Sequence, residues 1–390
     1  MDVRLFFNEA MKRGFVQLVR RPVFYIIMIV APLLCSFFML DLMRQGVVQR
    51  VPVGIVDLDG SSISRSIERN LGAMQNVSIT HHYRGYQEAI SAVQRDEVLG
   101  FIYLPAGLEH KALSGQDPTV SYYINYAYFT PASTQYKGFK TITLLANGAI
   151  AKTTLEATGL LTEGGVSAML QPILTRMHGL NNPWTNYSFY LNLSFVPCLL
   201  ALFILLMTSF SIGTELKYGT CREWIASAGG SIEFAVAGKL FPQTLIFTST
   251  GWMIQLLMFR VYGLPLNGNV WNMIVAMPLL VLACQAFALT MMCITPNFRY
   301  GTTLSTLLGV MSFSFCGFSL PSDSMYAWVH ALGNVMPVRY YFLLSIDQAL
   351  NGIPLYYSRY YYAALVAFTL LPWCLLWRLK RECINPVYVP

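Results

Sequence analysis

The chain has 390 residues, of which 55% are hydrophobic and only 12% are charged, and its mean hydropathy is +0.48. Soluble domains carry about a quarter charged residues, so this composition excludes an ordinary soluble protein and predicts an integral membrane protein. The net charge of +7 does not indicate nucleic-acid binding. The basic residues gather beside apolar runs, where they act as topology signals.

Residues 1–20 precede the first apolar run. Val3, Phe6, Ala10, Gly14 and Leu18 recur at steps of three and four residues, with the basic residues elsewhere on the helical wheel. This periodicity predicts an amphipathic helix that lies in the inner membrane interface. The alternative is a frayed cytoplasmic tail.

Six apolar runs without charged residues have about the length of a bilayer crossing, which takes roughly 20 helical residues. They are Pro22–Leu40, Ser188–Ile212, Leu240–Phe259, Val270–Thr295, Tyr300–Leu320 and Tyr361–Trp377. The first run lacks the small-residue cleavage site of a signal peptide, so we expect it to remain as an anchor. An even number of spans places both termini on one side. Basic residues before the first span and after the last predict that this side is the cytoplasm.

The stretch between the first and second spans, residues 42–186, has the composition of a soluble domain and alternates strand-like with helical segments. The expected strands are Val51–Asp57, Val77–His82, Leu99–Leu104 and Val120–Asn125, and the expected helices are Ser61–Asn70, Tyr86–Arg95 and Leu108–Leu113. This alternation predicts a small α/β sheet with helical crossovers. Residues 131–164 contain Lys137, Lys140, Lys152 and Glu156, so we expect a long helix outside the membrane rather than a seventh span.

The residue types that bind metals show no ligand spacing. The eight cysteines are scattered and none lies between residues 41 and 197, which excludes a disulfide-stapled external domain. We expect His81 and His82 to form a solvated strand end, with metal binding as the weaker alternative. We expect Asp57 and Asp59 to serve the Asp-Leu-Asp-Gly turn, with cation binding again the weaker alternative.

A short charged segment, residues 213–224, separates the second span from the third. Glu215, Lys217, Arg222 and Glu223 surround the Gly219-Thr220 pair. Together with Lys239, these basic residues predict that the segment faces the cytoplasm. The pattern fits either an ordinary solvated loop or an element to which another protein binds.

The arrangement of these features resembles the permease subunits of ABC exporters of the second type, which have the type V fold with six transmembrane helices. The family's cytoplasmic motif has a Glu, a basic residue, Gly-Thr, a further acid and then Gly-Lys. The matching residues, in order, are Glu215, Lys217, Gly219, Thr220, Glu223, Gly238 and Lys239. Gly317-Phe-Ser-Leu-Pro321 and Met336-Pro-Val-Arg-Tyr-Tyr341 are similar to landmarks between the family's last two spans. Trp224, Ala228-Gly-Gly and Tyr326 depart from its usual residues.

The opening of the external domain, Val53-Gly-Ile-Val-Asp-Leu-Asp-Gly-Ser61, resembles the subgroup with a large periplasmic α/β domain. The expected fold is therefore an α-helical polytopic membrane protein with six transmembrane helices and an inserted extracytoplasmic α/β domain between the first and second spans. Its segments are an interfacial helix (1–20), a first transmembrane helix (21–41), the periplasmic domain with its long helix (42–186), five transmembrane helices (187–381) and a cytoplasmic tail (382–390).

The resemblance implies a cytoplasmic coupling helix at 213–228 and an external re-entrant segment at 321–341. The implied ATPase-coupling residues are Glu215, Lys217, Gly219, Thr220, Arg222, Glu223 and Trp224, and the implied re-entrant residues are Gly317, Pro321 and Pro337. Glu215 and Glu223 would meet basic groups of a partner, while Trp224 would anchor the helix. Gly219 would allow a bend or a close approach.

The resemblance also implies partners and a location. The partners are a separate ABC ATPase, a second permease copy or a homologous permease, and membrane lipid; a periplasmic adaptor is a further candidate, and nucleic acid is not expected. The chain needs no cofactor of its own, since ATP and Mg²⁺ bind to the ATPase. The expected location is the bacterial cytoplasmic (inner) membrane, with many passes.

The sequence has no phosphate-binding loop of its own. Around Gly238-Lys239, Glu233 stands where the motif needs its first glycine and Leu240 where it needs Ser or Thr. We therefore expect no enzymatic activity from this chain and hydrolysis by another polypeptide.

The six apolar runs contain no Asp, Glu, Lys or Arg, and their most polar side chains are Gln243, Gln255 and Gln285. This favours export of an amphipathic small molecule, drug or lipid, although the glutamines fit equally well as ties between helices. Two other functions remain open: a membrane-anchored sensor with a ligand-binding periplasmic domain, and an ion-driven secondary transporter.

Overall fold

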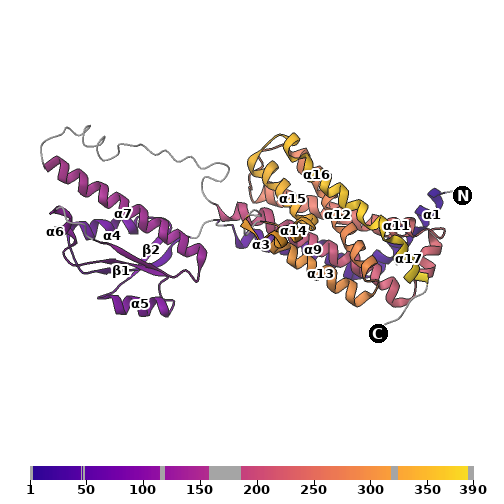
Figure 1. Cartoon of the computed structure of the whole chain (residues 1–390), viewed down its shortest axis with the longest axis horizontal. Coiled ribbons are helices and arrows are strands. Elements are labelled where there is room, and N and C mark those ends of the chain that lie inside the picture. Colours follow the sequence, from indigo (N-terminus) through magenta and orange to yellow (C-terminus); the bar gives the residue numbers. More distant parts are fainter. Residues whose placement is uncertain are drawn as a thin grey trace. The chain divides into compact units, whose positions relative to one another are not determined.

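The computed structural model describes residues 3–44, 46, 49–114, 119–157, 186–317 and 324–384. The chain divides into two compact units (Figure 1). The membrane unit comprises Met1–Gly46 and Gly179–Pro390, and the α/β unit comprises Val47–His178. The two units are described separately.

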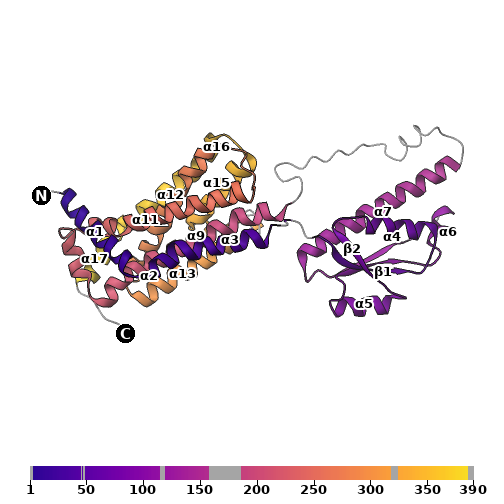
Figure 2. The same cartoon turned by 180° about the vertical axis from the view of Figure 1, so that it is seen from behind.

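The membrane unit is a bundle of helices (Figures 1 and 2). In chain order they are α1 (Val3–Arg20), α2 (Pro22–Tyr25), η1 (Ile26–Val30), α3 (Ala31–Leu42), α9 (Tyr187–Tyr218), α10 (Cys221–Ser227), α11 (Ile232–Leu256), η2 (Leu257–Val261), α12 (Val270–Ile294), α13 (Phe298–Phe315), α14 (Ala327–Asn334), α15 (Pro337–Ser345), η4 (Ile346–Asn351), α16 (Leu355–Leu370), η5 (Leu371–Cys374) and α17 (Leu376–Ile384). The predicted helix at 1–20 is confirmed as α1. It ends where Arg21 adopts an extended conformation before Pro22, as expected of a residue that precedes proline.

Among the described residues, five helical stretches are long and apolar enough to cross a membrane. They are Pro22–Leu42, Ser188–Tyr218, Ile232–Val261, Val270–Ile294 and Leu355–Ile384. The predicted third span begins earlier than expected, at Ile232 instead of Leu240, so Lys239 lies inside a helix. Helix α13 covers most of the predicted fifth span but is not one of these five. It contains Arg299 and a series of threonines, serines and glycines.

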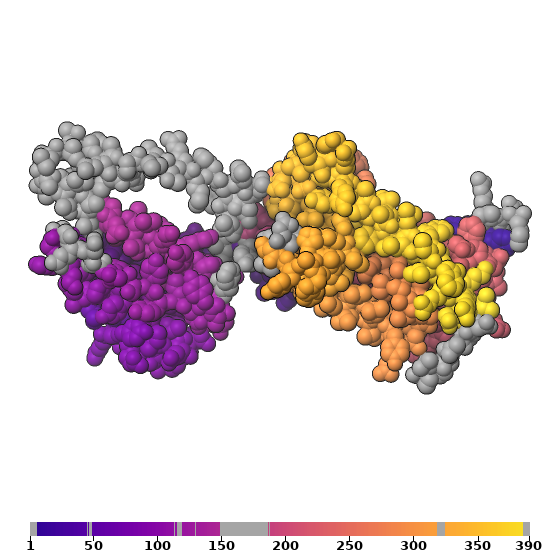
Figure 3. Space-filling view, in the orientation of Figure 1, coloured from indigo at the N-terminus to yellow at the C-terminus, as the bar shows by residue number. Residues whose placement is uncertain are grey.

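The centre of the bundle is formed by α9 and α12. In these two helices 67% and 72% of the apolar window is buried, against 28% for the first and last candidate spans. Helix α13 packs along α9. The outer helices expose large apolar side chains, including Tyr357, Tyr360, Trp373 and Trp377. The C-terminal residues, yellow in Figure 3, form part of the face of the membrane unit that this view shows.

The α/β unit contains a four-stranded sheet, as predicted. Its elements are β1 (Val51–Asp57), α4 (Ser62–Gly72), β2 (Val77–His82), α5 (Tyr86–Gln94), β3 (Gly100–Leu104), α6 (Leu108–Leu113), β4 (Ser121–Ile124) and α7 (Phe129–Ala157). The strand order is β2-β1-β3-β4. Strand β1 is parallel to β2 and β3, whereas β4 is antiparallel to β3.

Each face of the sheet has its own apolar cluster. Helices α4 and α7 cover one face, where Leu71 and Phe139 are fully buried, and α5 covers the other through Ala89 and Ala92. Figure 1 shows α5 on the opposite side of the sheet from α4 and α7. The long predicted helix is confirmed up to Ala157 and packs on the sheet, whereas residues 158–164 lie outside the described part.

The predicted turn after β1 is confirmed. The Asp57 carboxylate accepts hydrogen bonds from the backbone N–H groups of Asp59 and Gly60. Asp59 in turn accepts from the N–H groups of Leu108 and Glu109, at distances of 3.0 and 3.2 Å, and so caps α6. Partial burial raises the pKa of Asp59, but the hydrogen bonds that it accepts, from Ser61 first, outweigh burial and hold this pKa below its ordinary value.

We predict that residues 45–185 fold when expressed alone, because both sheet faces are covered within the unit and the segment contains no cysteine. Far-ultraviolet circular dichroism should show a mixed helix–strand spectrum that reductant does not change. A sharper check is Gly54→Ala, since a Cβ there would lie 2.5 Å from the Tyr83 ring. Such overpacking costs about 1–3 kcal/mol. Gly85→Ala is the matched control, because it meets open space. A random-coil spectrum for the isolated segment contradicts this prediction.

Candidate functional site

The predicted coupling segment forms two helical pieces that meet at a glycine. Residues 213–218 complete α9, and α10 begins at Cys221. Between them, Gly219 adopts a left-handed conformation with φ of +69°, and its N–H reaches the carbonyls of Glu215 and Leu216. This is the usual helix end in which glycine avoids the strain of a Cβ. The predicted bend at Gly219 is therefore confirmed.

The Glu215 side chain lies inside the protein and is only 1% exposed. It accepts hydrogen bonds from Gln17 Nε2 at 2.6 Å and from Arg13 Nη2 at 3.2 Å. It also accepts from the Thr220 hydroxyl and from Lys239 Nζ. The expectation that Glu215 meets a basic group of a partner protein is wrong. Arg13 from α1 and Lys239 from α11 form ion pairs with Glu215 within the chain.

Lys239 is the second buried charge of this cluster, with 3% of the residue exposed. Its Nζ donates to Glu215 and to Gln17 Oε1, the latter at 2.9 Å, and lies 5.2 Å from the centre of the Trp224 ring. The sequence indicates Lys239 only as a topology signal and does not predict its burial. Because α11 begins at Ile232, Lys239 points into the bundle rather than into solvent.

Small residues bring α1 close enough to α11 for this cluster to form. A Cβ at Gly14 would lie 3.1 Å from the Gly238 carbonyl oxygen, and a Cβ at Gly238 would lie 2.5 Å from the Ala10 Cβ. The close approach lets Arg13 and Gln17, which follow on the same helix, reach Glu215. The apolar stripe predicted for α1 thus packs at least partly against protein.

Helix α10 has one face that is buried against the bundle and one face that is exposed. Trp224 is 1% exposed, and its Nε1 donates to the Ala235 carbonyl at 3.0 Å. The predicted anchoring role of Trp224 is confirmed. Arg222 donates to the Ile384 carbonyl at 2.9 Å, which ties α10 to the end of α17. Glu223 and Lys217 are exposed, and the Lys217 ammonium lies over the Phe298 ring.

The predicted external landmarks occupy the segment between α13 and α16. Gly317 follows α13 with φ of +96°, and Pro337 is buried in the first turn of α15, whereas Pro321 lies outside the described residues. Helix α15 is buried along most of its length. It carries a charge that the apolar runs lacked, Arg339, which is 5% exposed. The sequence pattern predicts no buried charge here, because Arg339 lies outside the six apolar runs. The residue is nevertheless part of the Met336–Tyr341 landmark.

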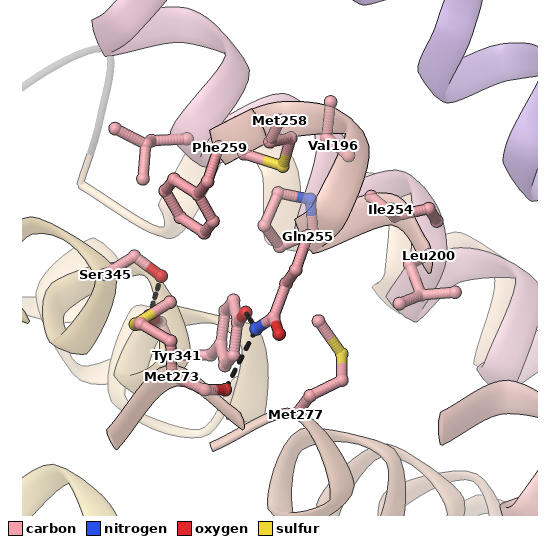
Figure 4. Close-up of a pocket in the computed structure, with 12 residues that line it drawn as sticks. Val196, Leu200, Ile254, Gln255, Met258, Phe259, Met273, Met277, Tyr341 and Ser345 are labelled. Atoms are coloured by element: carbon pink, nitrogen blue, oxygen red, sulfur yellow. Dashed lines mark hydrogen bonds between the residues drawn. The ribbon is translucent and has the colours of Figure 1, made fainter. Parts of the chain in front are cut away.

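The three glutamines tie helices together. Gln243 donates to Ser211, Gln285 accepts from Thr244, and Gln255 donates to the Met273 carbonyl and the Tyr341 hydroxyl. Figure 4 shows Gln255 beside a cavity lined mainly by methionines and aliphatic residues. The cavity of about 10 Å³ holds roughly one water molecule. It cannot accommodate a drug-sized ligand, which needs about 300 Å³ or more.

The described residues contain no group of three or more His, Cys, Asp or Glu side chains that could hold a metal ion. In the α/β unit, His82 Nε2 lies 2.7 Å from Glu68 Oε1 at an exposed position. This contact agrees with a solvated strand end.

A family model described as ABC-2 family transporter protein matches residues 22–378, which is most of the chain. No curated protein gives a significant match. The matched range includes Glu215, Lys239 and all of α10, whereas Arg13 and Gln17 precede it.

We predict that Glu215→Gln lowers the stability of the full-length protein by about 3–5 kcal/mol, because removing one partner leaves Lys239 buried without a counter-charge. The fall should appear as a lower Tm in detergent and as reduced accumulation in the membrane. Combining it with Lys239→Met should restore part of the loss. Glu223→Gln, at an exposed position of α10, is the matched control and should change stability by no more than about 0.5 kcal/mol. A wild-type Tm for Glu215→Gln would contradict a structural role for the ion pair.

Proposed function

Since the chain belongs to the ABC-2 transporter family, we propose that it is the permease subunit of an exporter that a separate ATPase drives. Members of this family typically lack an ATPase domain and generally pair with ABC ATPase subunits. Two permeases, identical or homologous, would form the transport unit. ATP and Mg²⁺ would bind only to the ATPase subunits.

The observation that carries this proposal is the construction of α10. Its inner face is held by Trp224 and by the Glu215 cluster, which joins α1, α9 and α11. Its outer face exposes Glu223. A helix anchored to several spans and open on one side can pass a displacement of a docked partner to those spans. An ordinary solvated loop needs no such anchoring, and neither does a sensor.

We assign α13 as the sixth span, in addition to the five candidates. Only a short turn, residues 295–297, joins α12 to α13, so α13 runs back along the bundle after α12 has crossed it. Its 18 residues extend about 27 Å at 1.5 Å per residue, close to the roughly 30 Å hydrocarbon core. Helices α14 and α15 then form the external re-entrant segment. Six spans leave both termini in the cytoplasm and the α/β unit in the periplasm.

The proposed cargo is an amphipathic small molecule, drug or lipid. The outer helices expose aromatic and aliphatic side chains to the bilayer, and the enclosed cavity is too small for such a molecule. The cargo would therefore move along a surface between two permeases rather than through one bundle. The α/β unit offers a surface for a periplasmic adaptor.

We predict that Glu223→Arg accumulates normally in the membrane but recovers little ATPase on pull-down and loses export. Reversing an exposed charge changes folding by only a few tenths of a kcal/mol, whereas like charges across a docked interface cost several kcal/mol. Glu9→Arg, an exposed charge reversal on α1, is the control and should keep full ATPase recovery. If Glu223→Arg retains ATPase binding and export, α10 is not the docking element. A sensor would show no ATP-linked defect.

The proposed topology is tested by single cysteines at two exposed positions, Lys111 in α6 and Lys12 in α1. In intact spheroplasts an impermeant maleimide should label Lys111→Cys, whereas Lys12→Cys should react only after lysis. The unmodified protein, which has eight native cysteines, gives the background. Labelling of Lys12→Cys before lysis would overturn the cytoplasmic placement of the N-terminus.

A further inference from the structure

Arg339 is a buried cation whose charge is not fully matched by the described residues. The residue is 5% exposed, and its Nη1 has no hydrogen-bond acceptor in the described part of the chain. Arginine stays protonated in proteins. A buried guanidinium is costly unless an anion or other acceptors satisfy it.

The surroundings of Arg339 add to the positive potential. It lies in the first turn of α15, where the helix dipole favours an anion and disfavours a cation. The carboxylate nearest to it along this segment, Asp347, lies at the far end in η4 and accepts from the Ser358 hydroxyl at 3.1 Å. The buried guanidinium and the dipole of α15 therefore both favour an anion beside the first turn of this helix.

The Arg339 guanidinium packs against Gly333, where a larger residue would be too close. A Cβ at Gly333 would lie 3.1 Å from Arg339 Nη1 and 2.7 Å from the Phe315 carbonyl oxygen. The guanidinium thus lies beside α14, close to the end of α13. Exposed apolar side chains occur in the same region: Val335, four residues before Arg339, is 50% exposed, and Tyr360 is 66% exposed. The Tyr360 ring contacts Tyr340, the residue after Arg339.

We propose that Arg339 binds the oxyanion headgroup, a phosphate or carboxylate, of an anionic amphiphile whose apolar tail lies on the adjoining surface. Guanidinium groups match the geometry of these oxyanions, and the exposed apolar surface suits a tail. The site deepens the proposed export function and rests on it for its placement, because α12 begins and α13 ends at this external end of the bundle. The binding test below uses the permease alone, so it can fail without affecting the ATPase assignment.

The test uses full-length permease purified in dodecyl maltoside, a neutral detergent, with Tm as the readout. Dodecyl phosphate should raise the Tm of the wild type in a concentration-dependent way, since a ligand that binds the folded state stabilises it. In Arg339→Gln the apparent affinity should fall by at least about tenfold, because a charge-assisted hydrogen bond is lost. Arg339→Lys should retain part of the response. Arg299→Gln, which removes an exposed cation of α13, should respond like the wild type.

A second measurement separates this site from an internal ion pair. Without ligand, Arg339→Gln should have an unchanged or higher Tm, because it removes a buried charge whose Nη1 has no acceptor among the described residues. A large fall in Tm, or failure to accumulate, means that Arg339 has a structural partner and overturns the proposal. A wild-type response to dodecyl phosphate in Arg339→Gln overturns it too.

Two further arms identify the source of the anion. Nanodiscs containing phosphatidylglycerol are compared with nanodiscs of phosphatidylcholine alone, and inorganic phosphate is added separately in detergent. A response to phosphatidylglycerol that Arg339→Gln lacks identifies a membrane phospholipid as the occupant. A response to dodecyl phosphate without one to phosphatidylglycerol supports a free amphiphile. An equal response to inorganic phosphate contradicts the need for an apolar tail.

Discussion

The network around the buried Glu215 carboxylate is the interaction on which the end of the bundle that carries α10 depends. The carboxylate sits at the end of α9 and is held by Arg13 and Gln17 from α1 and by Lys239 from α11. The Thr220 hydroxyl is a fourth donor to this carboxylate, so none of these helices can shift alone without leaving a charge or a polar group unsatisfied. Displacing α1, α9 or α11 alone would therefore break part of this network.

That constraint explains why α10 is suited to transmit force. A short helix transmits little force if it can move relative to the helices that it packs against. Trp224 fills the space beneath α10 and donates to Ala235, while its ring also lies against the Lys239 ammonium. The same residues that neutralise Glu215 thereby hold α10. Apolar residues of equal volume would serve stability as well or better, but they would not hold α10, α1 and α11 in one defined register.

Much of the fold could be predicted from the sequence because its signals are local. Apolar runs mark spans, and the alternation of strand and helix in the α/β unit placed β1, β2 and α6 with the bounds that the structure has. The site could be predicted only in part. The position of α10 follows from a motif, and the anchoring role of Trp224 follows from its large apolar side chain. The burial of Glu215 depends on Arg13, which is 202 residues away in the chain, and no local pattern distinguishes an exposed charge from one paired at that distance.

Among the described residues, the buried charges at the two ends of the bundle differ in how completely their hydrogen bonds and ion pairs are satisfied. At the end that carries α10, the buried charges of Glu215 and Lys239 are paired, which makes this region stiff. Near the end where α12 begins, Nη1 of Arg339 has no hydrogen-bond acceptor among the described residues, and the Asp347 carboxylate accepts from the Ser358 hydroxyl. A stiff, electrically satisfied region can carry mechanical work, whereas an unsatisfied cation can change its interactions as a ligand arrives or leaves. Under the two proposals above, energy enters the bundle at the end that carries α10, and an anionic headgroup binds near the other end.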